Sequence, residues 1–214
     1  MTSAKGYLSR AIYELSDNAL NDEIYHFMEE MYHGRPYHNL DHVSYCLNEL
    51  RHVHMESMDF EDRMRLIVAI CFHDLMQDFM RPADAVSNSA EIMEESLIDV
   101  LSTSDIRIIK NLILSTGAKI CRTDLEHYMH DIDYSIMGNN SWNEYHAYVK
   151  AVEKEALQDG IHPKYFKTGR IDFLQLLLLQ TTIYSTEIFG NKYEWQARKN
   201  IAREIAERQK GELE

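Results

Sequence analysis

Apolar residues recur at helical spacing through almost the whole chain, and very few segments show the alternation of a strand. The 214 residues include only three prolines and eight glycines, so long segments run without a helix breaker. About nine helices are predicted, near 6–16, 20–33, 39–55, 60–79, 86–102, 104–116, 122–138, 141–158 and 168–184, followed by a last one near 191–210. Six glycines are expected to mark helix ends: Gly34, Gly117, Gly138, Gly160, Gly169 and Gly190.

The predicted fold class is therefore all-α, a compact helical bundle that forms a single domain over residues 1–214. A chain of this length can bury a sizeable core, and no linker, repeat or low-complexity tract interrupts it. The amphipathic segment from Trp142 to Leu157 is expected to pack in that core. The alternative is that this segment packs against a second subunit, so a homo-oligomer stays open as an expectation.

Charge and cysteine usage restrict the classes of partner and compartment. Lysine and arginine total 22 against 35 acids, a net charge of −13, which argues against binding of extended nucleic acid but leaves room for one small phosphorylated ligand. The three cysteines, Cys46, Cys71 and Cys121, form no paired spacing, and this favours a reducing, cytoplasmic setting.

No membrane attachment or export is expected. Residues 1–10 contain no apolar stretch long enough for a secretory signal. The apolar run from Ile171 to Leu179 is far shorter than the roughly 20 residues of a membrane span. We expect that run to be a buried core helix.

Histidines and aspartates gather in three separated segments. They are Tyr37-His38-Asn39-Leu40-Asp41-His42, Cys71-Phe72-His73-Asp74 and Asp131-Ile132-Asp133. Imidazole suits zinc, iron, nickel and similar ions, while carboxylate adds oxygen donors and charge neutralisation. A helix that begins near Asn39 would place His38 and His42 on nearly the same face. These residue types, brought together from separate helices, predict the site of a metal-dependent hydrolase.

The order of these motifs resembles the HD-domain superfamily of metal-dependent phosphohydrolases. The resemblance is closest to a branch of predicted hydrolases with four motifs, which read here Arg35-Pro36-Tyr37-His38-Asn39-Leu40-Asp41-His42, Phe72-His73-Asp74, Asp131-Ile132-Asp133-Tyr134-Ser135-Ile136-Met137-Gly138 and Gly169-Arg170. The first segment is also similar to the corresponding motif of mammalian cyclic-nucleotide phosphodiesterases. The matches extend from about Tyr32 to Ile205.

The resemblance implies a role for each matching residue. The metal ligands would be His42, His73, Asp74 and Asp131, and a metal held by Asp133 instead would contradict the last assignment. His38 would donate a proton to the leaving oxygen, and Asp74 would also orient the attacking water. Three cations would counter the charge of the substrate phosphate: Arg35, Lys119 and Arg170.

Departures from the branch narrow these expectations. The segment Leu114–Lys119 lacks the histidine that two-metal relatives carry, so one divalent ion is expected, with Mn, Zn, Ni, Co, Fe and Mg not distinguished. The same absence disfavours a di-iron oxygenase. The expected function is hydrolysis of a phosphate ester or anhydride in a small nucleotide, or in a related phosphate ester. The alternative is a catalytically impaired HD scaffold that binds a nucleotide or a protein partner.

Overall fold

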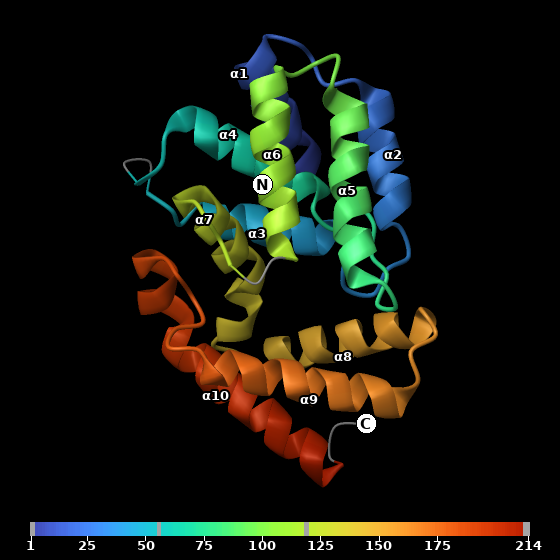
Figure 1. The fold of residues 1–214 in the computed structure, drawn as a ribbon, viewed down its shortest axis with the longest axis vertical. Helices are drawn as coiled ribbons and strands as arrows, with labels where there is room; N and C mark the ends of the chain where they lie inside the picture. The colour runs from blue at the N-terminus through green and yellow to red at the C-terminus, as the bar shows by residue number, and fades with distance from the viewer. Residues whose placement is uncertain (1–2, 55–56, 118–119, 212–214) are drawn as a thin grey trace. The chain divides into compact units, whose positions relative to one another are not determined.

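The structure is a computed structural model that describes residues 3–54, 57–117 and 120–211. The regular structure of these residues is helical, with no strand among them, which confirms the all-α prediction (Figure 1). The helices of the described residues are α1 (Ala4–Ser16), α2 (Asp22–Tyr32), α3 (Leu40–Leu50), α4 (Phe60–Phe72), α5 (Pro82–Leu97), α6 (Thr103–Thr116), α7 (Asp124–Tyr134), the 3-10 helix η2 (Ser135–Gly138), α8 (Trp142–Gln158), α9 (Pro163–Leu179) and α10 (Glu187–Lys210).

The chain divides into two compact units, Met1–His130 and Asp131–Glu214. The division falls inside α7, where the sequence carries no proline, glycine or change of composition that would mark a boundary. The single domain expected from the sequence stays a prediction.

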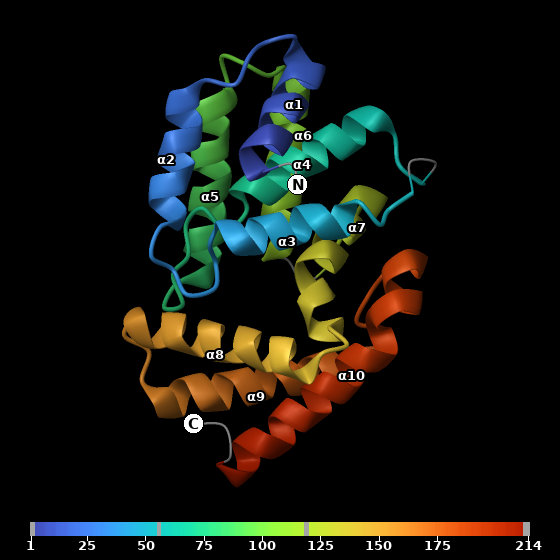
Figure 2. The same cartoon turned by 180° about the vertical axis from the view of Figure 1, so that it is seen from behind.

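In the first unit, α4 is the central helix. It packs against α1, α3, α5 and α6, and its last seven residues from Leu66 to Phe72 are at most 4 % exposed. Figures 1 and 2 show α5 and α6 side by side in this unit. His73 and Asp74 follow directly after Phe72, so they lie at the end of a helix that is buried nearly all round.

In the second unit, α9 packs against both α8 and α10 (Figure 2). The short helix η2 lies against α10, where a Cβ on Gly138 would stand 2.5 Å from the Cβ of Tyr193. The side-chain amide of Asn200 donates to the carbonyl oxygens of Met137 and Asn139 at 2.9 and 2.8 Å. These contacts fix the turn between α7 and α8 onto α10. The helix predicted from Trp142 to Leu157 packs in the core as expected, with Tyr145, Tyr148, Val149 and Val152 buried.

Several helices differ from the sequence prediction at their ends; α3, for example, was expected to reach residue 55 but ends at Leu50. Helix α4 was expected to continue to residue 79, but it ends at Phe72. Helix α9 was expected to begin near residue 168, but it begins at Pro163 with His162 as the capping residue. Proline is favoured at the first position of a helix because its missing N–H would have no partner there.

Some apolar and glycine positions also differ from expectation. Gly169 and Gly190 lie inside α9 and α10 rather than at helix ends. In the run from Ile171 to Leu179, Leu174 and Leu177 are buried, but Leu176 and Leu179 are 63 % and 81 % exposed. The expectation of a wholly buried core helix there was wrong, because α9 buries only one stripe. Among the described residues, none of the helices has the length and apolar character needed to span a membrane.

Candidate metal centre

Three residues of the first unit form a group that could hold a metal ion: His42, His73 and Asp74. All three were predicted as ligands from the sequence. The two imidazoles are buried, and the carboxylate is half-buried. The donor set of imidazole nitrogens and carboxylate oxygens suits a divalent transition metal.

The donor atoms of His42, His73 and Asp74 form a nearly equilateral triangle. The Nε2 atoms of His42 and His73 are 3.3 Å apart. The Oδ2 atom of Asp74 lies 3.2 Å from Nε2 of His42 and 3.0 Å from Nε2 of His73. Ligand atoms about 2.1 Å from one ion lie roughly 3.0–3.4 Å apart in octahedral or tetrahedral coordination. The triangle therefore fits three ligands of a single ion.

His42 is placed by the first turn of α3. Asn39 caps this helix, and its side-chain oxygen accepts hydrogen bonds from the N–H groups of Asp41 and His42 at 2.8 and 3.2 Å. An Asn cap that satisfies these N–H groups stabilises the helix start by about 1 kcal/mol. His38 precedes the cap and is not helical, so the two histidines do not share a helix face as expected.

His73 and Asp74 are placed by the end of α4. The Nδ1 atom of His73 lies 2.9 Å from the carbonyl oxygen of Ile70 and donates to it, which leaves the lone pair of Nε2 for a metal. Asp74 lies in the turn beyond the helix, where the backbone changes direction. Two adjacent residues on one helix would point about 100° apart. The end of α4 at Phe72 lets both side chains reach the same point.

Arg35 holds that turn in place. Its guanidinium donates to the carbonyl oxygens of Asp74 and Leu75 at 2.6 and 2.7 Å and lies over the ring of Tyr32. These carbonyls follow the end of α4 and have no helical partner. Arg35 was predicted to bind substrate phosphate, which stays a prediction. The contacts observed give it a positioning role.

The charge of Asp74 is favoured by its neighbours. Burial by itself raises the pKa of the carboxyl group, but the nearby His73 and His38 imidazoles and the contacts of the carboxylate with the His42 and His73 rings outweigh this effect. The pKa of Asp74 therefore lies well below its usual range, and the carboxylate is ionised at neutral pH. An ionised carboxylate is the form that binds a cation.

His38 lies next to the triangle and is not one of its three residues. Its ring centre is 6.0 Å from that of His42, 5.9 Å from that of Phe79 and 4.8 Å from that of Tyr37. The ring is half-buried. The role of His38 as a proton donor stays a prediction.

Asp131, the fourth predicted ligand, belongs to the second unit, where its side chain is fully buried. It accepts hydrogen bonds from the N–H groups of Ser185 and Thr186 and from the Thr186 hydroxyl, at 2.7–3.1 Å. Thr186 is the residue that caps α10. Asp131 therefore anchors the start of α10, and its role as a ligand stays a prediction.

The two other predicted phosphate-binding residues have different outcomes. Arg170 is buried in the second unit, where it donates to both carboxylate oxygens of Glu204 at 3.0 and 3.2 Å and to the Tyr148 hydroxyl at 3.1 Å. Its contacts there are those of a core ion pair. Lys119 lies outside the described residues.

Comparisons of the chain with protein-family models, with curated proteins and with solved structures found no match. The functional interpretation accordingly depends on the geometry of this group and on the sequence motifs.

Proposed function

We propose that this chain is a metal-dependent phosphohydrolase of the HD-domain superfamily that acts on a small nucleotide or a related phosphate ester. The observation that carries the proposal is the triangle of His42 Nε2, His73 Nε2 and Asp74 Oδ2, with edges of 3.0–3.3 Å. Two imidazoles and a carboxylate from separate segments are a donor set typical of hydrolytic sites, which keep a position open for water or substrate. The motif resemblance supports the choice of phosphate ester as substrate.

Each side chain has a distinct task in this proposal. A divalent ion at this group would polarise a phosphoryl oxygen and lower the pKa of its bound water. His42 and His73 orient the site, and the ionised Asp74 accepts a hydrogen bond from the attacking water. His38 donates a proton to the leaving oxygen, a task that histidine side chains perform as general acids in many enzymes.

The fourth protein ligand proposed from the motif resemblance is Asp131, whose carboxylate also accepts hydrogen bonds from the N–H groups of Ser185 and Thr186. Residues two apart on a helix point about 200° apart, so the carboxylates of Asp131 and Asp133 leave α7 on opposite sides. Replacement of each aspartate by asparagine, with metal content measured by mass spectrometry, tests the assignment. Loss of metal from Asp133→Asn alone would contradict it.

The reaction is tested with a nucleotide panel. Protein loaded in turn with Mn, Co, Ni or Zn is incubated with nucleoside mono- and triphosphates and cyclic nucleotides, and released phosphate, pyrophosphate and nucleoside are measured. We expect His38→Asn to retain metal and lose about 10²–10⁴-fold in rate. Asp74→Asn should lose both metal and activity. His26→Asn, an exposed histidine on α2 that pairs with Glu29, is the matched control.

The outcome that contradicts the proposal is equally specific. If loaded wild-type protein releases no product from the panel and Asp74→Asn retains its metal, the chain is not a metal-dependent hydrolase. The HD scaffold that binds a nucleotide or a protein without hydrolysis would then be favoured.

A further inference from the structure

A basic pocket lies wholly within the second unit. It has a volume of about 970 Å³ and is lined by the last turns of α8, the first turns of α9 and the C-terminal end of α10. Its charged lining residues are Lys150, Glu153, Lys154, Lys164, Lys167 and Arg208. Five cations thus face a single carboxylate, in a chain whose net charge is −13.

The four lysines are available to a ligand. Lys150, Lys154, Lys164 and Lys167 form no ion pair with any residue in the part of the chain that the structure describes. Lysines near the C-terminal end of α8 stabilise this helix, because their positive charge interacts favourably with the negative end of the helix dipole. Lys164 and Lys167 lie in the first two turns of α9, where the helix end is already positive and no acidic residue is present in the first turn. Helix stability therefore does not account for them.

Arg208 supplies a second and independent indication of a ligand. Its side chain is fully buried, with Nε donating to Glu204 at 2.9 Å and Nη1 to Glu153 at 3.2 Å. Within residues 3–54, 57–117 and 120–211, no atom accepts a hydrogen bond from its buried Nη2. An unpaired N–H of a buried charged group is destabilising. A phosphate oxygen bound to this nitrogen would remove the penalty.

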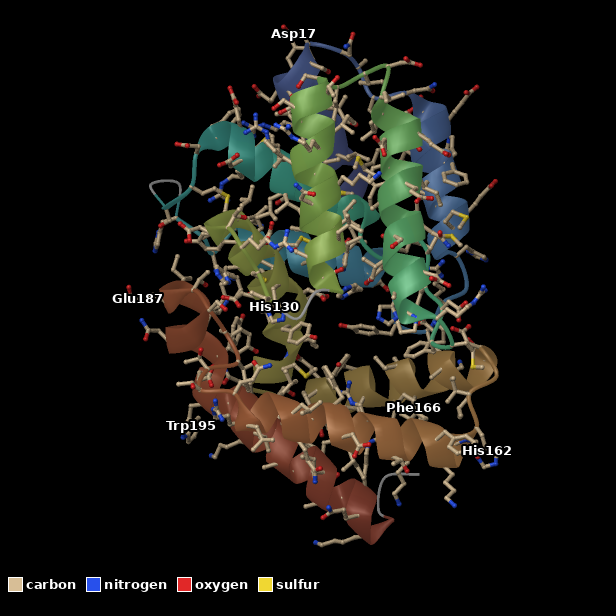
Figure 3. All side chains as sticks on the ribbon, in the orientation of Figure 1. Asp17, His130, His162, Phe166, Glu187 and Trp195 are labelled. Atoms are coloured by element: carbon tan, nitrogen blue, oxygen red, sulfur yellow. The ribbon has the colours of Figure 1, made fainter. Side chains whose placement is uncertain are left out.

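The pocket also has an apolar wall. Leu157 and Pro163 line it, together with the methylene stems of the lysines. The guanidinium of Arg208 lies 5.2 Å from the ring centre of Phe166, which Figure 3 labels near the start of α9. The volume is within the range of small-molecule sites.

We propose that this pocket binds a small molecule that carries two or more phosphate groups on an apolar or planar body, as a nucleoside di- or triphosphate does. Several unpaired lysines require several negative charges, and the buried guanidinium nitrogen takes one phosphate oxygen. The apolar wall takes the body of the ligand. This site is separate from the metal group, and the proposal does not depend on the proposed hydrolase activity.

Calorimetric titration tests the proposal. ATP, AMP and inorganic pyrophosphate are titrated into the whole chain at low ionic strength with EDTA present, so that the metal group is not loaded. We expect ATP to bind more than tenfold more tightly than AMP. The double variant Lys154→Gln/Lys164→Gln should weaken ATP binding about tenfold, because each exposed charge pair contributes about threefold. Lys199→Gln, an exposed lysine of α10 outside the pocket, should bind ATP as the wild type does.

Several results would overturn the proposal. They are no heat from ATP, AMP binding as tightly as ATP, equal ATP affinity in the double variant and in Lys199→Gln, and tighter binding of a single-stranded oligonucleotide than of ATP. Asp74→Asn must bind ATP like the wild type in EDTA. If ATP binding is lost in that variant, the nucleotide belongs to the metal group instead.

Discussion

At the scale of single residues, Arg35 links the loop before α3 to the turn after α4. We expect Arg35→Lys to lower metal affinity about tenfold, because a single ammonium cannot bond both the Asp74 and Leu75 carbonyls and the Asp74 carboxylate is then less well positioned. Competition with a fluorescent chelator measures this affinity. Arg10→Lys on α1, whose arginine forms an exposed pair with Glu14, is the control.

The same variant separates the two roles assigned to Arg35. If Arg35 binds substrate phosphate, as the sequence predicts, Arg35→Lys raises KM and leaves metal affinity unchanged. If Arg35 positions Asp74, the metal affinity of Arg35→Lys falls, and an excess of the metal ion restores much of the rate of hydrolysis.

The sequence could predict the residues of the metal group only in part. His42, His73 and Asp74 stand in short motifs whose residue types already indicate a metal, and the structure brings them together. The hydrogen bonds to Asp131 could not be predicted, because their donors Ser185 and Thr186 lie more than fifty residues further along the chain. The partners of Arg35 are backbone carbonyls, which no sequence pattern reveals.

At the scale of the helices, Glu204 joins α8, α9 and α10. Its buried carboxylate accepts hydrogen bonds from Tyr145, Arg170 and Arg208 at 2.6–3.2 Å. We expect Glu204→Gln to lower the free energy of unfolding by about 3–5 kcal/mol, because it leaves two buried guanidinium groups without their counter-charge. Urea unfolding followed by circular dichroism measures it. Glu207→Gln, an exposed pair with Arg203 on the same helix, should change stability by less than about 1 kcal/mol.

The Glu204 carboxylate also makes stability depend on pH. Burial raises the pKa of this carboxyl group, but the contacts with Arg170, Tyr145 and Arg208 lower the pKa by a larger amount. The pKa therefore lies below its ordinary value of 4.5. A carboxyl whose pKa is lowered on folding stabilises the protein above its unfolded pKa and loses that contribution as the pH falls. Wild-type stability should therefore decline from about pH 5 downward. A Glu204→Gln variant with the same slope in this range would contradict this origin.

Replacement of two glycines by alanine should change the stability of the protein in opposite directions, at Gly138 in η2 and at Gly169 in α9. Gly138→Ala places a Cβ 2.5 Å from the Cβ of Tyr193 and should destabilise the protein by about 1–3 kcal/mol. Gly169→Ala inside α9 meets no atom within 4 Å and should stabilise it by about 0.5–1 kcal/mol. The midpoints of thermal unfolding compare the two. A stabilising Gly138→Ala would mean that η2 can move away from α10.

Helical spacing predicted which segments form helices better than it predicted where they end. Gly169 was expected to end a helix, yet α9 runs through it because Phe166, Leu174 and Leu177 form a continuous buried stripe. The early end of α4 depends on contacts made by the turn itself, such as the bond from the Met76 N–H to Ser89. Such tertiary contacts override local preference and cannot be read from spacing.

At the scale of the whole molecule, a ligand that binds only the folded chain stabilises all of it. At a metal concentration one hundred times the dissociation constant, the gain is about 2.7 kcal/mol. For a chain of this length we expect a rise in melting temperature of about 5–10 °C, because 1 kcal/mol corresponds to about 2–4 °C. Differential scanning fluorimetry with and without EDTA measures the shift. Asp74→Asn should show little or none, and an equal shift in that variant would place the metal elsewhere.

The all-α class follows from the pattern of the whole sequence, whereas the division into two units does not. The boundary lies between His130 and Asp131 within a continuous helix, and a helix has the same local pattern on both sides of such a boundary. The division arises from which distant residues each half of the chain packs against. A single sequence contains no direct record of those pairings.

The hydrogen bond from His73 Nδ1 to Ile70 has a consequence for the rate of metal uptake. It selects one tautomer and one ring orientation before any ion arrives, and the ionised Asp74 adds an attractive charge beside it. The His73 imidazole is therefore already in the rotamer that would bind the metal. Uptake should therefore follow the order of water exchange on the aqua ions, slow for Ni²⁺ and fast for Mn²⁺ and Zn²⁺, rather than a common rate set by motion of the protein.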